Sequence, residues 1–297
     1  AAVLVSHDGP FYNQYLIQTM DALILHPDPS RSLPPFIAIS VSTGTKTDGT
    51  GSLRDIQYDT VSGKYAGFVA DEIFGAVLTN PEIRSAYPRL RFTSDPTGRL
   101  SLGCSSGAAA GFSMAWFRPD LFGRVVGYSA TLVTKDTMLP SNTSYPLAAW
   151  EFHSPPADLI RSSPKRPIRI FHSVSNHDLG TTSDTPYPAC DFDAGGRQTV
   201  VNTTLGCYAQ PGLCEGTPAA GHGVFHNMLD PLHSDWAVAN NATAAALQVR
   251  GYEHRFAYAL SACHCDPRIF LQDLPSTLVW AWRGWPRPRD SSGRPHA

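Results

Sequence analysis

The stretch "GRLSLGCSSGAAAGFSMAWF", residues 98–117, decides the fold. It begins with a run typical of a buried β-strand, passes through small residues and continues as an alanine-rich helix. Between them stands "GCSSG", residues 103–107, a G-x-S-x-G sequence that in this context marks a strained turn exposing a nucleophilic serine. Such a turn needs small residues two positions before and after the nucleophile, because the flanking main chain comes close together. Ser105 is the residue so flanked.

The two adjacent serines therefore receive different roles. We expect Ser105 to be the nucleophile. Ser106 opens the helix, where its main-chain N–H would point at a developing oxyanion. Because the motif also arises by chance in loops rich in glycine and serine, the interpretation depends on a later acid and a later histidine.

Both partners stand in the expected order. A serine hydroxyl needs a general base, and the base needs an orienting acid. In this architecture the acid follows a later strand and the histidine follows the last one. Asp178 comes after a strong strand pattern and His264 after the final strand pattern. We predict a Ser105, Asp178, His264 triad, with Glu253 as the alternative acid.

The rest of the chain alternates short β-branched runs with helix-length amphipathic stretches, which predicts an α/β fold with a mostly parallel sheet and helices on both faces. Residues 42–63 are expected to form a polar loop, and Pro81 to end a helix that buries one face. The expected strands are 2–9, 34–41, 99–104, 124–130, 166–174 and 255–261, and the expected helices are 12–25, 63–83, 107–117, 236–251 and 274–282. The buried face of the second helix is expected to comprise Tyr65, Phe68, Val69, Ile73, Ala76 and Val77.

Length and composition limit the possible domain organisation and the class of protein. A chain of 297 residues that is 42% hydrophobic and 16% charged is too apolar for a disordered protein and long enough for one large core. We expect a single domain over residues 1–285, with an insertion at about 181–233 and a disordered tail at 286–297. The net charge of −2 favours a small or neutral partner over nucleic acid, and no apolar run is long enough to cross a membrane. The oligomeric state is not indicated.

Cysteines and glycosylation signals favour a secreted protein or another oxidising compartment. The chain has six cysteines and three N-x-S/T triplets, at Asn142, Asn202 and Asn241. It also starts without Met on a strand pattern, which favours the earlier loss of an upstream segment, a signal segment included.

The cysteine before the nucleophile has candidate partners beside the base. Cys263 and Cys265 flank His264, so a bridge from Cys104 to either would tie the nucleophile turn to the histidine loop. We favour Cys104–Cys265, with Cys263 joined to a cysteine of the insertion, although spacing does not decide the pairing. A buried free thiol at Cys104 is the alternative.

The remaining histidines give no metal signature. His172 lies inside a strand pattern, where a histidine is more often packed than catalytic, whereas His177 adjoins Asp178 and is expected to line the site. The insertion contains an H-x3-H spacing without the acidic partner of a metalloprotease motif, so we expect neither a metal nor a cofactor. The insertion histidines are His222, His226 and His233.

These segments resemble an esterase family of α/β-hydrolases that includes enterochelin esterases, feruloyl esterases, the S-formylglutathione hydrolase group and mycolyltransferases. The resemblance rests on "VSHDGPFY" (5–12), "IQYDTVSGKYAGFVADEIFGAV" (56–77), the block 95–130 around the nucleophile, "RPIRIFHSVSNHDLG" (166–180), "WAVANNATAAAL" (236–247) and "LPSTLVWAWRGWP" (274–286). It implies an α/β-hydrolase fold and a triad for ester hydrolysis, and leaves open whether the chain lacks the first strands of that fold. The arrangement C-S, D, H-C is similar to the disulfide-braced triads of fungal feruloyl esterases and tannases, which supports Cys104–Cys265.

The chain departs from the family pattern at two functional positions. In the family the second oxyanion donor is the main-chain N–H just after a D-G pair, but here that residue is Pro10, which has no N–H. Gly9 or Phe11 is expected to donate instead. The glutamate of the family's E-Y-D segment is Gln57 here.

Together these features predict a serine carboxylic ester hydrolase acting on a small-molecule ester. An acyltransferase using the same triad and a catalytically inactive binding module are the alternatives. Phe11, Tyr12 and Tyr58 are candidate substrate-lining residues that suit a protein core equally well.

Overall fold

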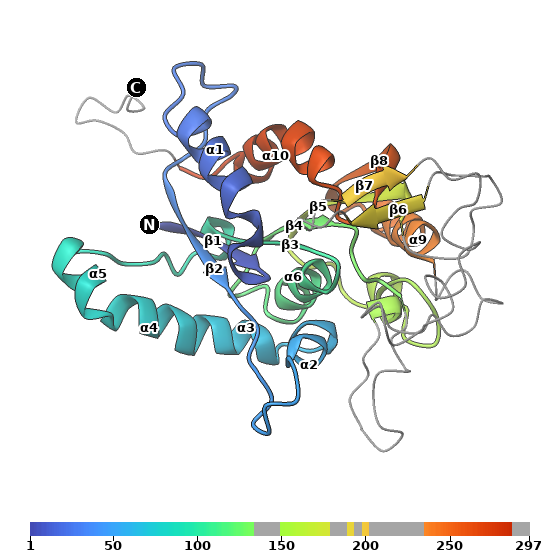
Figure 1. Ribbon diagram of the computed structural model, residues 1–297, viewed down its shortest axis with the longest axis horizontal. Helices are drawn as coiled ribbons and strands as arrows, with labels where there is room; N and C mark the ends of the chain where they lie inside the picture. The colour runs from blue at the N-terminus through green and yellow to red at the C-terminus, as the bar shows by residue number, and fades with distance from the viewer. Residues whose placement is uncertain (134–148, 179–188, 193–197, 202–234, 287–297) are drawn as a thin grey trace.

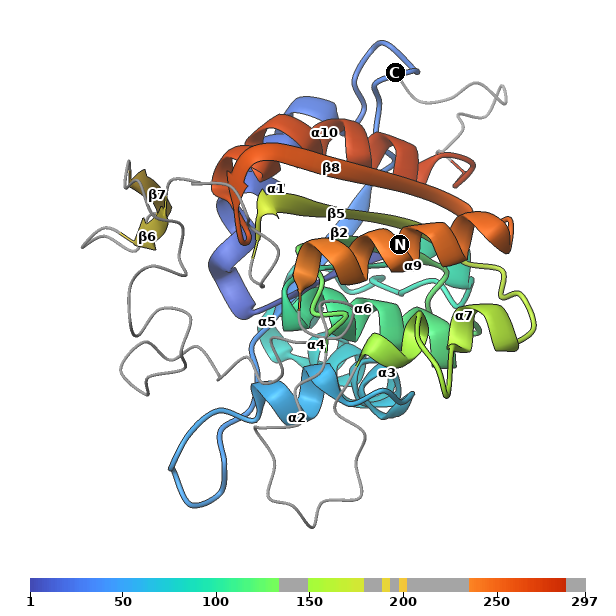
Figure 2. The same cartoon turned by 90° about the vertical axis from the view of Figure 1, so that its right-hand side faces the viewer.

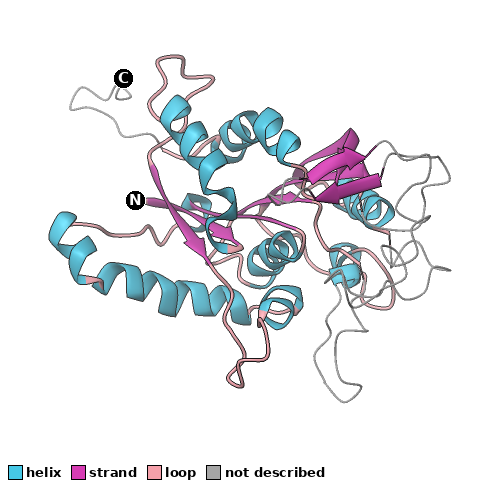
Figure 3. Cartoon of the chain, viewed as in Figure 1, coloured by secondary structure: helices cyan, strands magenta, loops and turns pink. Residues whose placement is uncertain are grey.

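A six-stranded parallel sheet forms the centre of the molecule (Figure 3). The computed structural model describes residues 1–133, 149–178, 189–192, 198–201 and 235–286. The strands are β1 (Ala2–His7), β2 (Phe36–Val41), β3 (Arg99–Cys104), β4 (Arg124–Tyr128), β5 (Arg169–His177) and β8 (Glu253–Cys263), in the spatial order β2-β1-β3-β4-β5-β8. Every neighbouring pair is parallel, so the carboxyl ends of all six strands meet at one edge of the sheet.

Helices cover both faces of this sheet (Figures 1 and 2). One face packs against α1 (Asn13–Leu23) and α10 (Pro267–Trp282), and the other against α6 (Ser106–Phe117) and α9 (Trp236–Val249). Side chains alternate between the two cores along each strand. In β1, for example, Val3 and Val5 belong to the core under α6, whereas Ala2 and Leu4 belong to the core under α1. The predicted α/β architecture with helices on both faces is confirmed.

The loop expected at 42–63 contains a helix, α2 (Arg54–Asp59), which the sequence prediction missed. A six-residue helix is too short to show a clear 3.6-residue period. Its last turn places Tyr58 and Asp59 in the interior. The segment is therefore a fixed part of the fold and holds Arg54 close to the carboxyl end of β1.

The helix expected at 63–83 is interrupted. It consists of α3 (Lys64–Phe68), a π-helical turn (Val69–Ile73) and α4 (Phe74–Thr79), and the chain then restarts at Pro81 as α5 (Pro81–Ala86). The π turn adds a residue to the helical period. Ile73, the last residue of the turn, still packs against the core as predicted. Beyond the turn the predicted buried face was wrong, because Phe74 is buried and Ala76 is exposed.

The C-terminal helix starts seven residues earlier than the predicted 274, at Pro267. Asp266 caps its N-terminus, because its carboxylate accepts the Arg268 N–H at 2.9 Å, and Pro267 suits the first helical position. Pro275 lies inside the helix, where a sequence-based assignment places a boundary.

The insertion expected at about 181–233 lies largely outside the described residues, and so does the tail from residue 287. The described part of the insertion is a two-stranded antiparallel sheet, β6 (Ala189–Phe192) and β7 (Gln198–Val201), which the lack of clear periodicity did not predict. The single domain over 1–285 stays a prediction. None of the described helices is long and apolar enough to cross a membrane.

Candidate active site

The turn between β3 and α6 has the geometry expected for an exposed nucleophile. Ser105 has φ 56° and ψ −129°, a strained backbone conformation for a residue with a side chain. Its N–H donates to the carbonyl of Tyr128 at 3.0 Å, which fixes the turn to the end of β4. A Cβ added to Gly103 would lie 2.5 Å from the carbonyl carbon of Gly107, so glycine is required there by close main-chain approach.

The acid and the histidine meet across the ends of β5 and β8. Asp178 directly follows β5, and His264 directly follows β8. The His264 Nδ1 lies 2.5 Å from Asp178 Oδ1, and the carboxylate is fully buried while the imidazole is partly exposed. The Trp236 ring contacts the imidazole edge to face at a centroid distance of 5.9 Å. This arrangement fixes the ring and leaves Nε2 as the nitrogen available for chemistry.

The Ser105 hydroxyl has a partner of its own. Ser105 Oγ lies 3.2 Å from Thr131 Oγ1, and the Thr131 N–H donates to the Ser105 carbonyl at 3.1 Å. Thr131 is buried and follows β4 by three positions. The sequence analysis did not single out this residue, because no local motif marks a threonine after a strand.

Ser129 is a second site residue that sequence reasoning missed. Its hydroxyl donates to Asp178 Oδ2 at 2.6 Å and accepts the Cys265 N–H at 3.1 Å. The Ser175 N–H donates to the same carboxylate oxygen at 3.3 Å. The buried carboxylate is thereby supplied with hydrogen-bond donors on the side away from His264.

The disulfide Cys104–Cys265 links the nucleophile turn to the histidine loop, with 6.0 Å between the two Cα atoms. In the sheet β3 and β8 are three strand spacings apart, which corresponds to about 14 Å. The loop after β8 therefore folds back over the ends of β5 and β4 to reach Cys104. This bond excludes both the alternative pairing of Cys104 with Cys263 and the free thiol at Cys104. Cys263 is disulfide-bonded as well.

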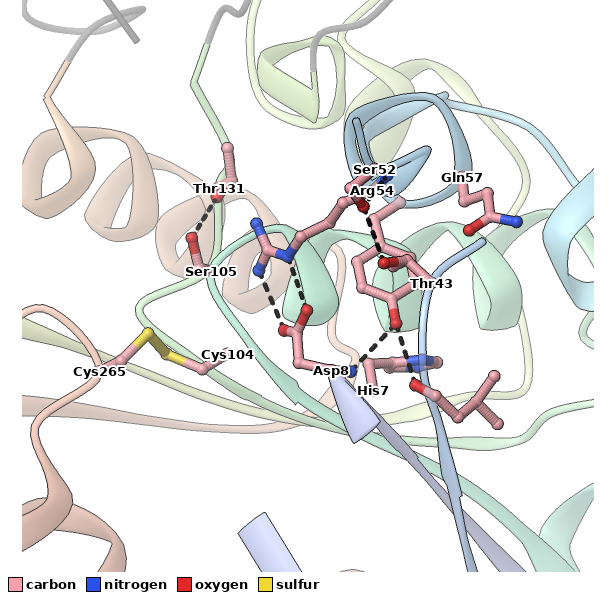
Figure 4. A network of polar contacts seen from close by, with 12 residues as sticks. His7, Asp8, Thr43, Ser52, Arg54, Gln57, Cys104, Ser105, Thr131 and Cys265 are labelled. Carbon is pink, nitrogen blue, oxygen red and sulfur yellow. Dashed lines mark hydrogen bonds and ion pairs between the residues drawn. A yellow bond between two sulfur atoms is a disulfide. The ribbon is translucent and has the colours of Figure 1, made fainter. Parts of the chain in front are cut away.

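An ion pair stiffens the turn after β1 (Figure 4). Arg54 Nε and Nη2 donate to the two oxygens of Asp8 at 2.6 and 2.9 Å. The Asp8 N–H donates to the Tyr58 hydroxyl at 3.0 Å. A Cβ added to Gly107 would lie 3.0 Å from Asp8 Oδ2, so this carboxylate sits against the first turn of α6. Asp8 and Arg54 are 46 residues apart, and no motif joins them in the sequence.

The oxyanion candidates lie around this turn. Ser106 opens α6, at the end of the helix where the helix dipole favours negative charge. Gly9 has φ +64° and an added Cβ would be 2.5 Å from the Ser42 Oγ, so no other residue fits there without rearrangement. Phe11 is 52% exposed. Gln57, in place of the family's glutamate, accepts the Gly44 N–H at 2.9 Å and so holds the preceding loop.

The four weakly predicted substrate-lining residues have different surroundings. Tyr58 is fully buried and donates to the Val41 carbonyl at 3.3 Å, and burial raises its pKa. Tyr12 is 2% exposed and packs on Phe270. Phe11 presents its ring to the surface, and His177 ends β5 opposite Cys263.

The competing assignments lie elsewhere. Glu253 starts β8 and pairs with Arg169 and Arg283, so the length of the strand, about 30 Å or more, separates it from His264. His172 is buried between Asn240 and His254, as expected for a packed histidine, and burial lowers its pKa to about 3. Glu253, the alternative acid, is therefore excluded by its distance from His264.

Metal binding, glycosylation and an oxidising compartment were also considered from the sequence. Among the residues that the structure describes, no group of three His, Cys, Asp or Glu side chains could hold a metal ion. Asn241 is exposed on α9, and its sequon stays a prediction. A disulfide is typical of an oxidising compartment, which agrees with the predicted localisation. The insertion histidines His222, His226 and His233 and the sequons at Asn142 and Asn202 lie outside the described residues.

The solved structures that are similar to this chain include esterases. A ferulic acid esterase structure is 14% identical, with a TM-score of 0.53, over 95% of this chain and 84% of its own. Enterobactin esterase structures from Shigella flexneri and Salmonella typhimurium are 13% and 12% identical, each with a TM-score of 0.51 over 95% of this chain. This chain spans about half the length of those enterobactin esterases. The chain has the α/β-hydrolase fold. No protein-family model and no curated protein matches the sequence.

Proposed function

We propose that the protein is a serine carboxylic ester hydrolase in which Ser105 is the nucleophile, His264 the general base and Asp178 the orienting acid. The observation that carries the proposal is the 2.5 Å contact between His264 Nδ1 and the buried Asp178 carboxylate, at the same sheet edge as the strained Ser105 turn. Strained backbone at such a turn is typical of a nucleophile that must project from a sheet.

The reaction follows from these positions. His264 Nε2 takes the proton of the Ser105 hydroxyl as Oγ attacks the ester carbonyl, and Asp178 stabilises the imidazolium that forms. The imidazolium then protonates the departing alcohol, which leaves an acyl group on Ser105. A water molecule, deprotonated by the same nitrogen, attacks the acyl carbon. The imidazolium then returns the proton to Ser105 Oγ as the acyl–oxygen bond breaks and the acid leaves. All proton transfers use side chains of this chain, so the mechanism calls for no cofactor.

The oxyanion formed in each half-reaction is stabilised by main-chain N–H groups. Ser106 supplies one donor from the first turn of α6, where the helix dipole also favours negative charge. For the second donor we favour Gly9 over Phe11, because Gly9 adjoins Asp8, whose carboxylate sits against Gly107 at the start of the same helix. The Asp8–Arg54 ion pair would hold this turn in place during turnover.

Thr131 has a place in the resting state. Its contact with Ser105 Oγ holds the hydroxyl in one orientation before substrate binds. Catalytic hydrogen bonds are often established only in the substrate complex, so attack requires the Ser105 hydroxyl to exchange Thr131 for His264.

The substrate class is a small carboxylic ester. The net charge of −2 gives no electrostatic reason to bind nucleic acid. The structural neighbours are named as ferulic acid and enterobactin esterases, which supports ester hydrolysis as the reaction class. The aromatic ring of Phe11, half-exposed beside the proposed oxyanion turn, is suited to contact an acyl group.

Hydrolysis of p-nitrophenyl acetate and butyrate by wild type, Ser105→Ala and Ser106→Ala tests the proposal. Ser105→Ala is expected to lose about a thousandfold or more in kcat. Ser106→Ala removes a hydroxyl at the adjacent position but keeps the main-chain N–H, and is expected to lose far less. Full turnover by Ser105→Ala would refute the mechanism, and loss confined to Ser106→Ala would move the nucleophile by one residue.

Analysis of the products of the same reaction, with and without an added alcohol, separates the two alternatives. An acyltransferase would give more ester product than free acid when an alcohol is added, whereas a hydrolase would release acid in both conditions. A catalytically inactive binding module would show no turnover that depends on Ser105.

A further inference from the structure

We propose that Ser129 is a positioning residue for this reaction, an inference that rests on the proposed function. Ser129 is the first residue after β4, and it is 3% exposed. It orients the Asp178 carboxylate and, through the same hydroxyl, holds the main chain of the histidine loop. It does not touch the Ser105 hydroxyl, so its role is exerted through the acid and the base.

The direction of its hydrogen bonds is determined by their partners. The Cys265 N–H can only donate, so Ser129 Oγ is the acceptor at 3.1 Å. The hydroxyl proton is then directed to Asp178 Oδ2, which lies 2.6 Å away. With Oδ2 occupied by this donor and by the Ser175 N–H, the carboxylate presents Oδ1 to His264.

The backbone at this position is independently unusual. Ser129 has φ 46°, in the left-handed region that residues with side chains rarely adopt, and its N–H donates to the Ser173 carbonyl at 2.8 Å. This conformation turns the chain at the end of β4 so that the side chain faces β5 and β8. A glycine would relieve the strain but would lose the hydroxyl, which argues that the hydroxyl is the reason for a serine here.

The consequence for catalysis is electrostatic and geometric. A fully buried carboxylate stays ionised only when donors replace its lost hydration, and the Ser129 hydroxyl is one of them. Without it the ionised carboxylate has one donor fewer, and Oδ2 keeps the longer contact from the Ser175 N–H. The Cys265 main chain would also lose its bond to β4, although the disulfide to Cys104 would still anchor the loop.

The test compares Ser129→Ala and Ser129→Gly with wild type and Ser105→Ala on p-nitrophenyl butyrate across pH. Both Ser129 variants are expected to lower kcat by about 10- to 100-fold with KM within about twofold, the loss that corresponds to one hydrogen bond to a charged group. The acidic limb of the kcat/KM profile should move to higher pH. Ser129→Gly relieves the strained backbone and Ser129→Ala does not, so a similar loss in both identifies the hydroxyl as the cause.

Ser101→Ala is the matched control. Ser101 is also buried and lies in the middle of β3, and its hydroxyl is 2.7 Å from His7 Nε2 within the core. This variant is expected to lose stability while keeping the kcat and the pH profile of wild type. Melting temperatures of all variants show whether each is folded at the assay temperature.

The outcomes distinguish the two proposals. If Ser105→Ala keeps full turnover, the proposed function fails and the role of Ser129 fails with it. If Ser105→Ala is inactive while both Ser129 variants keep the kcat and the pH limb of wild type, the positioning role alone is overturned. A loss of kcat with an unmoved acidic limb would likewise overturn it, because a purely structural role predicts that result.

Discussion

Removing the Cys104–Cys265 disulfide should destabilise the protein far more than most single substitutions. The bond joins residues separated by 161 positions, and cross-linking over so long a loop removes a large part of the conformational entropy of the unfolded chain. The chain-entropy relation gives a contribution of about 5 kcal/mol for a loop of this length. A typical domain is stable by about 5–15 kcal/mol, so the variant Cys104→Ala/Cys265→Ala should lose a third or more of its free energy of unfolding.

The assay is denaturant and thermal unfolding followed by circular dichroism, after a mass spectrum of the unreduced digest has shown the peptide that joins Cys104 to Cys265. The melting temperature is expected to fall by about 10 to 20 °C. The m-value should rise, because the unfolded chain expands when the cross-link is gone. The variant Cys104→Val/Cys265→Ala controls for packing, since it also lacks the bond but fills more of the buried site at Cys104.

Two results would refute this reasoning. A loss of less than about 1 kcal/mol with an unchanged m-value would show that the cross-link does not act through the unfolded chain. Recovery of stability by the valine variant would show that local packing at Cys104, and not the bond, carries the effect.

Two further predictions concern the core. Burial lowers the pKa of His7 to about 4 and that of His172 to about 3, so each is neutral when folded and protonated when unfolded from about pH 6.5 down to its folded pKa. The free energy of unfolding, measured in urea, should therefore fall by about 1.4 kcal/mol for each histidine per unit that the pH is lowered over that range. His172→Gln should reduce this dependence of stability on pH. An unchanged dependence would contradict a neutral, buried His172. Gly103→Ala should prevent folding, because its Cβ would clash with the Gly107 main chain. In the control Gly75→Ala the new Cβ meets no atom within 4 Å, so this variant should stabilise α4 by up to about 1 kcal/mol. A soluble and active Gly103→Ala variant would count against the close approach of the two main-chain segments.

Local chemistry explains why the nucleophile turn could be predicted from sequence. The strand, the flanking glycines and the helix lie within twenty consecutive residues, and each depends on a backbone requirement that only certain residues meet. The order of strands predicted that Asp178 and His264 would lie together, because parallel strands place their carboxyl ends at one edge, and the two side chains do meet there. The pairing of Cys104 with Cys265 rested on resemblance and on proximity to His264, and it agrees with the structure.

The missed features are those that depend on contacts distant in sequence or on irregular backbone. The π turn at residues 69–73 shifts the helical period without any proline or glycine to announce it. The pairing of Asp8 with Arg54 depends on how α2 packs against α6 beside the residue that follows β1, which no local pattern encodes. Ser129 became recognisable only when its φ angle and its two partners were known.

The position of β4 explains why these missed residues matter to the site. Ser105 follows β3, whereas Asp178 and His264 follow β5 and β8, so β4 separates the two halves of the proposed triad within the sheet. It contributes no triad residue, yet the chain leaving β4 contacts both halves: Thr131 bonds to Ser105, and Ser129 bonds to Asp178 and to the loop of His264. The disulfide spans the same gap covalently. Alignment of nucleophile and base across an intervening strand thus requires contacts between the segments that follow the strands. Substitutions in residues 129–131 should therefore change the rate of ester hydrolysis although they leave the proposed triad residues in place.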